Sequence, residues 1–158
     1  MSIKIEPSAL ETFRSNLCGT LLAPQDRGYE EACKTWDLTV EQHPSLVAII
    51  ANATDAIAAV NFARIQGLKI TIQSTGHGII SPSDGGLLVN TSRMKGVKID
   101  PQMRTARVEA GVLWNDVIQK AQTYQLATLS GFASNVGVVR LCIATEQFWS
   151  VSSGTRIS

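Results

Sequence analysis

A strand–helix–strand pattern in the first half of the chain constrains its fold most strongly. Residues 46–50 form a continuous apolar run, which is typical of a strand buried on both faces. Residues 55–66 predict an apolar helix, with Thr54 able to cap its start and Gly67 placed where a helix commonly ends. Residues 69–73 predict a second strand, and a helical connection of this kind makes the two strands parallel.

The segment before this pattern predicts one helix followed by irregular chain. Residues 7–19 carry Leu and Phe side chains at helical spacing, which predicts a short helix. Residues 20–44 are punctuated by Pro and Gly, so we expect a loop there. Two aromatic residues in this loop, Tyr29 and Trp36, are expected to pack on the core.

The segment after the pattern predicts a strand, a hairpin and a helix. Residues 87–90 read as a third strand. Residues 97–108 alternate apolar and polar side chains on both sides of a turn that begins at Asp100, which predicts an antiparallel hairpin. Residues 113–124 predict a helix with one apolar face, and Trp114 is expected in the core.

Together these elements predict an α+β fold in two parts. A small parallel β–α–β layer over residues 40–91 would lead into a partial antiparallel portion over residues 92–139. The net charge is +1 and the 14 basic residues are scattered, so nucleic acid is not an expected partner. No long apolar run that could span a membrane is visible, and no signal peptide is visible either, so we expect a cytoplasmic protein by default.

The three cysteines predict neither a disulfide framework nor a metal site. Cys18, Cys33 and Cys142 are odd in number and widely spaced, without a CxxC motif. We expect three free thiols.

Glycine flanks a histidine directly after the second predicted strand, at Gly76, His77 and Gly78. A glycine-containing turn in this place is suited to bind phosphate, because its backbone N–H groups can face an anion and no Cβ blocks close approach. The motif is weak by itself, since a lone histidine in a turn is more often a solvated residue. The Rossmann and Walker fingerprints are absent. The other histidine, His43, is expected on the surface.

Four segments over residues 21–139 carry a family resemblance. They are APQDRGYEEACKTWD, HPSLVAIIANATDAIAAVNFARIQGLKITIQSTGHG, DGGLLVNTSRMKGVKIDPQMRTARVEAGVLW and LATLSGFASNVGVV, in that order. With them the chain resembles the N-terminal FAD-binding domain of the vanillyl-alcohol oxidase / p-cresol methylhydroxylase (PCMH-type) family, and most of all the berberine-bridge-enzyme-like oxidoreductases. The resemblance implies FAD in a groove between the two parts of the fold. It also implies oxidation of an alcohol, a sugar or a natural product, with hydride transfer to the flavin.

The resemblance further implies site residues. A pyrophosphate loop corresponds to Gln73, Ser74, Thr75, Gly76, His77, Gly78 and Ile79, and a second flavin-contacting stretch contributes Gly131, Ser134 and Gly137. His77 matches the histidine that commonly bonds to the 8α-methyl group of the flavin. Some members carry a cysteine for a second bond where this chain has Ala133, which allows at most one covalent bond. The family often has arginine at the position of Gln73.

The resemblance ends after Val139. We therefore expect an N-terminal helix and loop (residues 1–39), an incomplete PCMH-type FAD-binding domain (residues 40–139) and a divergent tail (residues 140–158). The chain is interpreted as a truncated form that lacks the substrate domain, binds FAD weakly and has no turnover. A naturally short relative and a non-catalytic binding module are the alternatives.

No catalytic residue is assigned from the sequence. Glu109 and Asp116 could be proposed as an acid and a base, but nothing marks a perturbed environment and both are expected to be solvated. The partner of a full-length relative would be a small-molecule substrate. The oligomeric state is not predicted.

Overall fold

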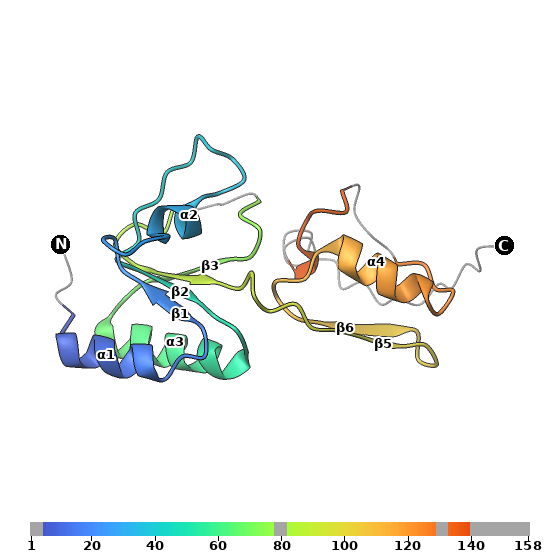
Figure 1. Cartoon of the computed structure of the whole chain (residues 1–158), viewed down its shortest axis with the longest axis horizontal. Helices are drawn as coiled ribbons and strands as arrows, with labels where there is room; N and C mark the ends of the chain where they lie inside the picture. The colour runs from blue at the N-terminus through green and yellow to red at the C-terminus, as the bar shows by residue number, and fades with distance from the viewer. Residues whose placement is uncertain (1–4, 78–81, 129–132, 140–158) are drawn as a thin grey trace. The chain divides into compact units, whose positions relative to one another are not determined.

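The computed structural model describes residues 5–77, 82–128 and 133–139, and the chain forms two compact units (Figure 1). The first unit comprises residues 1–93 and the second residues 94–158. This division is close to the boundary expected between the parallel and antiparallel parts. The tail expected after Val139 lies outside the described residues.

A four-stranded sheet forms the centre of the first unit. Its strands are β1 (Thr20–Leu22), β2 (Leu46–Ile49), β3 (Ile70–Gln73) and β4 (Leu87–Asn90), in the spatial order β1-β2-β4-β3. The strands β2, β4 and β3 run parallel, and β1 pairs antiparallel with β2. The parallel direction predicted for the strand–helix–strand pattern is confirmed, and β4 lies between the two strands of that pattern.

Helices lie on both faces of this sheet. α1 (Pro7–Ser15) and α3 (Ala53–Gln66) lie on one side, and the short α2 (Tyr29–Cys33) lies on the other (Figure 1). Phe13 of α1 stacks on Phe62 of α3, with ring centroids 4.2 Å apart. This pair joins the N-terminal helix to the central one.

The core on the α2 side combines apolar side chains with one buried hydroxyl. Val47 and Leu88, from the two central strands, are completely buried and cluster with Tyr29 and Cys33 of α2. The Tyr29 hydroxyl donates a 2.5 Å hydrogen bond to the Pro44 carbonyl, and burial raises the pKa of Tyr29. Tyr29 therefore packs on the core as predicted.

Two predictions for residues 20–44 are wrong. The segment is not a continuous loop, because it contains β1 and α2, and both are too short to show a period in the sequence. Trp36 does not pack in the core, since 66% of its surface is exposed.

A buried carboxylate connects three segments of the first unit. Asp55, in the first turn of α3, is fully buried. It accepts hydrogen bonds of 2.9 Å from the backbone N–H groups of Cys18, Gly19 and Ala51. The side chain thus links the approach to β1, the end of β2 and the start of α3.

The ends of α3 differ in how well the sequence predicted them. The N-cap is Asn52, whose Oδ1 accepts a 2.9 Å hydrogen bond from the Asp55 N–H. The assignment of this role to Thr54 is wrong, because the helix begins at Ala53 and Thr54 already lies within it. Gly67 ends the helix in a left-handed conformation, with φ of 65°, as predicted.

The second unit is a hairpin packed on a helix. β5 (Val97–Asp100) and β6 (Thr105–Val108) pair antiparallel, and α4 (Trp114–Gln122) packs against β5. Trp114 and Val117 are buried in the apolar core of this unit. The hairpin, the helix and the core position of Trp114 are as predicted.

The two acidic residues weighed as an acid–base pair bind backbone groups. Glu109 Oε2 accepts a 2.7 Å hydrogen bond from the Gly96 N–H beside the hairpin. Asp116 Oδ2 accepts a 3.0 Å hydrogen bond from the Leu113 N–H at the start of α4. Both carboxylates therefore stabilise local backbone structure.

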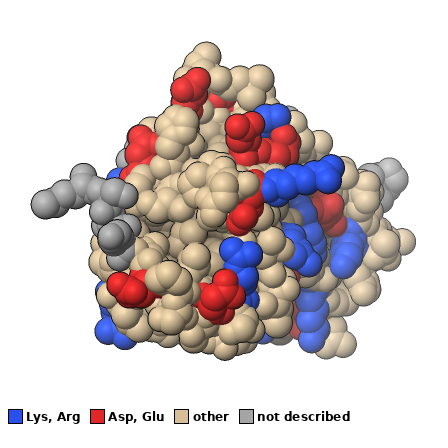
Figure 2. All heavy atoms as spheres, turned by 60° about the vertical axis from the view of Figure 1, so that its left-hand side comes forward, with Lys and Arg blue, Asp and Glu red and all other residues tan. Residues whose placement is uncertain are grey.

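The described surface is mixed in charge. On the face shown in Figure 2, Lys and Arg side chains stand among Asp, Glu and uncharged residues. The side chain of His43 is 76% exposed, as expected. Cys18 is exposed and Cys33 is buried, and both are free thiols. Within residues 5–77, 82–128 and 133–139, no helix has the length and apolar character needed to cross a membrane.

Replacing Asp55 by alanine should destabilise the first unit strongly. The change removes the shared acceptor of three partly buried backbone N–H donors, so we expect a loss of about 3–5 kcal/mol in the free energy of unfolding. Chemical denaturation followed by circular dichroism measures the effect.

Asp84→Ala is the matched control. Asp84 is exposed and accepts one backbone hydrogen bond, from the His43 N–H at 2.7 Å. Its removal should lower the free energy of unfolding by only about 1 kcal/mol. Equal losses in the two variants would show that the buried network does not carry the stability assigned to it. If Asp55→Ala fails to fold, Asp55→Asn keeps one acceptor oxygen and should fall between the control and the alanine variant.

Candidate functional site

The carboxyl ends of three parallel strands lie side by side in the first unit. Ile49 of β2 is paired in register with Asn90 of β4, and Asn90 is paired with Gln73 of β3. Because these strands run in one direction, the chain leaves the sheet at the same edge after each of them. Ligands of open parallel sheets bind outside this edge. The segment from Gln73 to His77 begins there.

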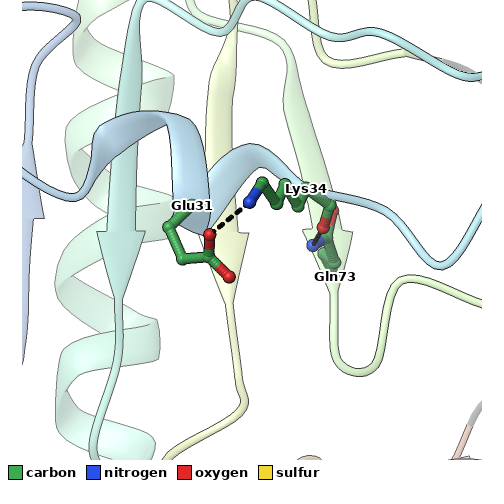
Figure 3. Close-up of polar contacts among 3 residues, drawn as sticks. All are labelled: Glu31, Lys34 and Gln73. Atoms are coloured by element: carbon green, nitrogen blue, oxygen red, sulfur yellow. Dashed lines mark hydrogen bonds and ion pairs between the residues drawn. The ribbon is translucent and has the colours of Figure 1, made fainter. Parts of the chain in front are cut away.

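The Gln73 side chain forms its hydrogen bonds with other residues of the protein. It is buried, Nε2 donates to the Lys34 carbonyl at 2.8 Å, and Oε1 accepts from Gln42 Nε2 at 2.7 Å. Figure 3 shows the Gln73 side chain beside the backbone of Lys34, whose ammonium group pairs with Glu31 at 2.6 Å. Gln73 therefore joins the end of β3 to the segment that follows α2.

Gly76 allows two backbone segments to approach closely. It is buried with φ of 73°, and its carbonyl accepts a 3.2 Å hydrogen bond from the Trp36 N–H. A Cβ here would lie 3.0 Å from both Thr35 Cα and Trp36 N. The sequence interpretation attributed this glycine to the approach of phosphate. In the structure the neighbouring backbone already requires it.

His77 contacts two residues from different segments. Its Nδ1 lies 3.0 Å from Thr75 Oγ1, and its ring stacks on Trp36 with centroids 5.0 Å apart and planes inclined by 23°. Sequence reasoning missed this contact because it placed Trp36 in the core. A tryptophan in a loop, outside any periodic element, is the one signal that could have indicated it.

Ser74 and Thr75 lie between Gln73 and the histidine-bearing turn, and both are half-buried. The Ser74 Oγ atom is buried and has no hydrogen-bond partner among the residues that the structure describes. Buried hydroxyls are usually satisfied by protein, water or a bound molecule. Ser74 therefore offers a polar atom at the strand edge where a ligand would enter.

The second set of predicted site residues lies in the other unit. Ser134 is exposed, and its carbonyl accepts a 2.8 Å hydrogen bond from the Asn115 N–H. Gly137 is buried and forms an antiparallel bridge with Leu113. Three further predicted residues lie outside the described ranges, namely Gly78, Ile79 and Gly131.

Comparison with known proteins identifies the family of the chain. Residues 44–139 match the family described as FAD binding domain, which is more than half of the chain. The chain belongs to this family. FAD is therefore its cofactor, as the resemblance implied.

Oxidases and FAD-linked oxidoreductases share this FAD binding domain. (R)-6-hydroxynicotine oxidase of Paenarthrobacter nicotinovorans is 31% identical over 127 residues, which are 79% of this chain and 28% of that protein. An FAD-linked oxidoreductase of Dictyostelium discoideum is 34% identical over 105 residues, which are 66% of this chain and 23% of that protein. The chain thus spans less than a third of the length of these relatives.

Solved structures confirm the fold predicted for the FAD binding domain. 6-Hydroxy-D-nicotine oxidase from Arthrobacter nicotinovorans has a TM-score of 0.72 and 31% identity, covering 77% of this chain and 27% of that one. BBE-like 1 from Physcomitrella patens has a TM-score of 0.73 and 20% identity, covering 82% of this chain and 29% of that one. The α+β, PCMH-type fold is confirmed.

The described residues fit the phosphate end of FAD. The Ser74 hydroxyl is buried without a protein partner in the described part of the chain, beside the edge at which parallel sheets bind ligands. Gly76, in the turn after this strand, has a positive φ, which is the kind of backbone conformation found in anion-binding nests. The fit concerns residues of the first unit alone.

Replacing Gly76 by alanine should destabilise the first unit even in the absence of FAD. The new Cβ adds a clash with the Thr35–Trp36 backbone to the strain of a positive φ. Gly67→Ala is the matched control, since Gly67 has φ of 65° and nothing within 4 Å of the added Cβ.

We expect a loss of about 1–2 kcal/mol for Gly67→Ala and about 1–3 kcal/mol more for Gly76→Ala. Thermal denaturation of the apoprotein measures both. Equal losses would mean that the close backbone approach at Gly76 is not what demands a glycine.

Proposed function

We propose that this chain is the FAD-binding part of a flavin-dependent oxidoreductase. In support, its relatives include FAD-linked oxidoreductases, and it spans less than a third of their length. When bound, FAD supplies an acceptor for a hydride taken from an alcohol, a sugar or another natural product. The residues assigned here bind and orient the cofactor, and none of them is assigned to catalysis.

The turn that follows β3 carries this proposal. Ser74 Oγ and the backbone N–H groups around Gly76 would bind the pyrophosphate, and Thr75 would support the histidine. Gln73 would act indirectly, by holding the start of the turn against the Lys34 carbonyl. The remaining members of the proposed set are Gly78, Ile79, Gly131, Ser134 and Gly137.

His77 is proposed to bond covalently to the 8α carbon of the flavin. Forming the bond would release one proton from the imidazole and one from the 8α-methyl group and leave two electrons on the flavin, which dioxygen would accept with the two protons to give hydrogen peroxide. In support, His77 lies in the turn that follows β3 and is held by a hydrogen bond and a ring stack. A fixed imidazole favours this reaction because orientation is set before the bond forms.

His77→Ala should abolish acid-stable flavin while leaving the fold intact. The ring is half-buried in a loop, so its loss should change the free energy of unfolding by about 1 kcal/mol or less. The measurement is the flavin absorbance that stays with the protein after incubation with FAD and acid precipitation.

The chain contains only one other histidine, which makes His43→Ala the matched control. His43 is exposed, and its removal should leave acid-stable flavin unchanged. Acid-stable flavin in His77→Ala at the wild-type level would exclude His77 as the attachment point. Reversible FAD binding in the wild type without an acid-stable fraction would exclude the covalent bond and leave the proposed FAD-binding role standing.

A further inference from the structure

An exposed tryptophan lies against the histidine of the turn. Trp36 has 66% of its surface exposed, so it adds little to the core of the first unit. Its indole nevertheless stacks on the His77 imidazole, with centroids 5.0 Å apart and planes inclined by 23°. Trp36 is thus mostly exposed to solvent and yet stacks on the histidine proposed to bond to the flavin. This contact indicates a role at His77.

The backbone around Trp36 is fixed to the same turn. The Trp36 N–H donates to the Gly76 carbonyl at 3.2 Å. One residue earlier, the Thr35 hydroxyl donates to the Asp37 carbonyl and holds the bend of the loop. The position of the indole over the imidazole therefore follows from two backbone segments that are packed together, with no space for a Cβ at Gly76.

A second contact sets the rotation of the imidazole within its plane. Nδ1 lies 3.0 Å from Thr75 Oγ1, whereas Nε2 has no partner among the residues that the structure describes. The Thr75 hydroxyl can donate to Nδ1 or accept from it, so this contact fixes the rotation of the ring whichever nitrogen carries the proton. The lone pairs of the imidazole nitrogens lie in the plane of the ring, so a stack that fixes the plane also fixes the direction in which the ring can react.

We infer that Trp36 is the positioning residue for His77. Thr75 fixes the rotation of the imidazole within its plane, and Trp36 fixes the plane itself. This inference rests on the proposed function of His77. It adds a residue from the α2–β2 connection to a site otherwise built from the β3–β4 connection.

The test uses three variants that leave the backbone contacts of the loop in place. Trp36→Ala removes the stacked ring, Trp36→Phe keeps an aromatic ring, and Leu38→Ala is the matched control. Leu38 lies in the same loop and is 79% exposed. All three are compared with the wild type as apoprotein and after incubation with FAD.

The first readout is nuclear magnetic resonance of the apoprotein, which does not depend on flavin. The two histidines give two sets of imidazole signals, and His43→Ala assigns them. Loss of the indole ring current should move the His77 ring protons downfield in Trp36→Ala, with partial restoration in Trp36→Phe and no change in Leu38→Ala. Unchanged His77 signals in Trp36→Ala would overturn the positioning role.

The second readout is the rate at which acid-stable flavin forms. We expect a decrease of about tenfold in Trp36→Ala, since loss of orientation slows bond formation, and a change of less than about twofold in Trp36→Phe and Leu38→Ala. A wild-type rate in Trp36→Ala, with His77→Ala inactive, would overturn this inference and leave the proposed function standing. No acid-stable flavin in the wild type would overturn the covalent role of His77 and this inference with it.

Discussion

The carboxylate of Asp55 is the interaction on which the first unit depends. It is fully buried and is surrounded by three backbone donors that have no other role in the sheet or helix ladders. Gly19 can come this close to the end of β2 because it has no Cβ. An added Cβ would lie 2.0 Å from the Ile49 carbonyl oxygen. One side chain thus fixes where β1 meets β2 and where α3 begins. Because β2 ends at the edge of the sheet that carries the candidate site, this arrangement also helps to fix the position of that edge.

The sequence predicted the elements whose apolar patterns are long and strong. The buried strand β2, the helix α3 and the hairpin of the second unit follow from apolar runs, periodicity and turn chemistry. The three-residue β1 and the five-residue α2 were missed because they are too short for an apolar pattern to repeat reliably. The helix cap was placed at Thr54 although Asn52 serves, since both residue types suit that role and only the backbone path decides between them.

The candidate site, like the fold, could be predicted only in part. His77 and its neighbours were found because they follow a strand and match a family, and the chain belongs to that family. The roles of Gln73 and Gly76 in holding the turn could not be predicted, because their partners at Lys34 and Trp36 are distant in sequence. Long-range backbone contacts leave no periodic trace. The glycine next to a functional histidine therefore reflects protein packing as well as any ligand.

The strand order of the first unit determines when the sheet can be completed. β4 is the last of its four strands in the sequence, yet it supplies the hydrogen-bond partners of both β2 and β3. During synthesis α3 can form from local contacts, but β3 has no neighbour in the sheet until Leu87–Asn90 has been made. Such non-local parallel pairing is slow compared with helix formation. A nascent chain that pauses before this strand would leave β3 unpaired and one edge of β2 open, which is the state in which chaperones would meet it.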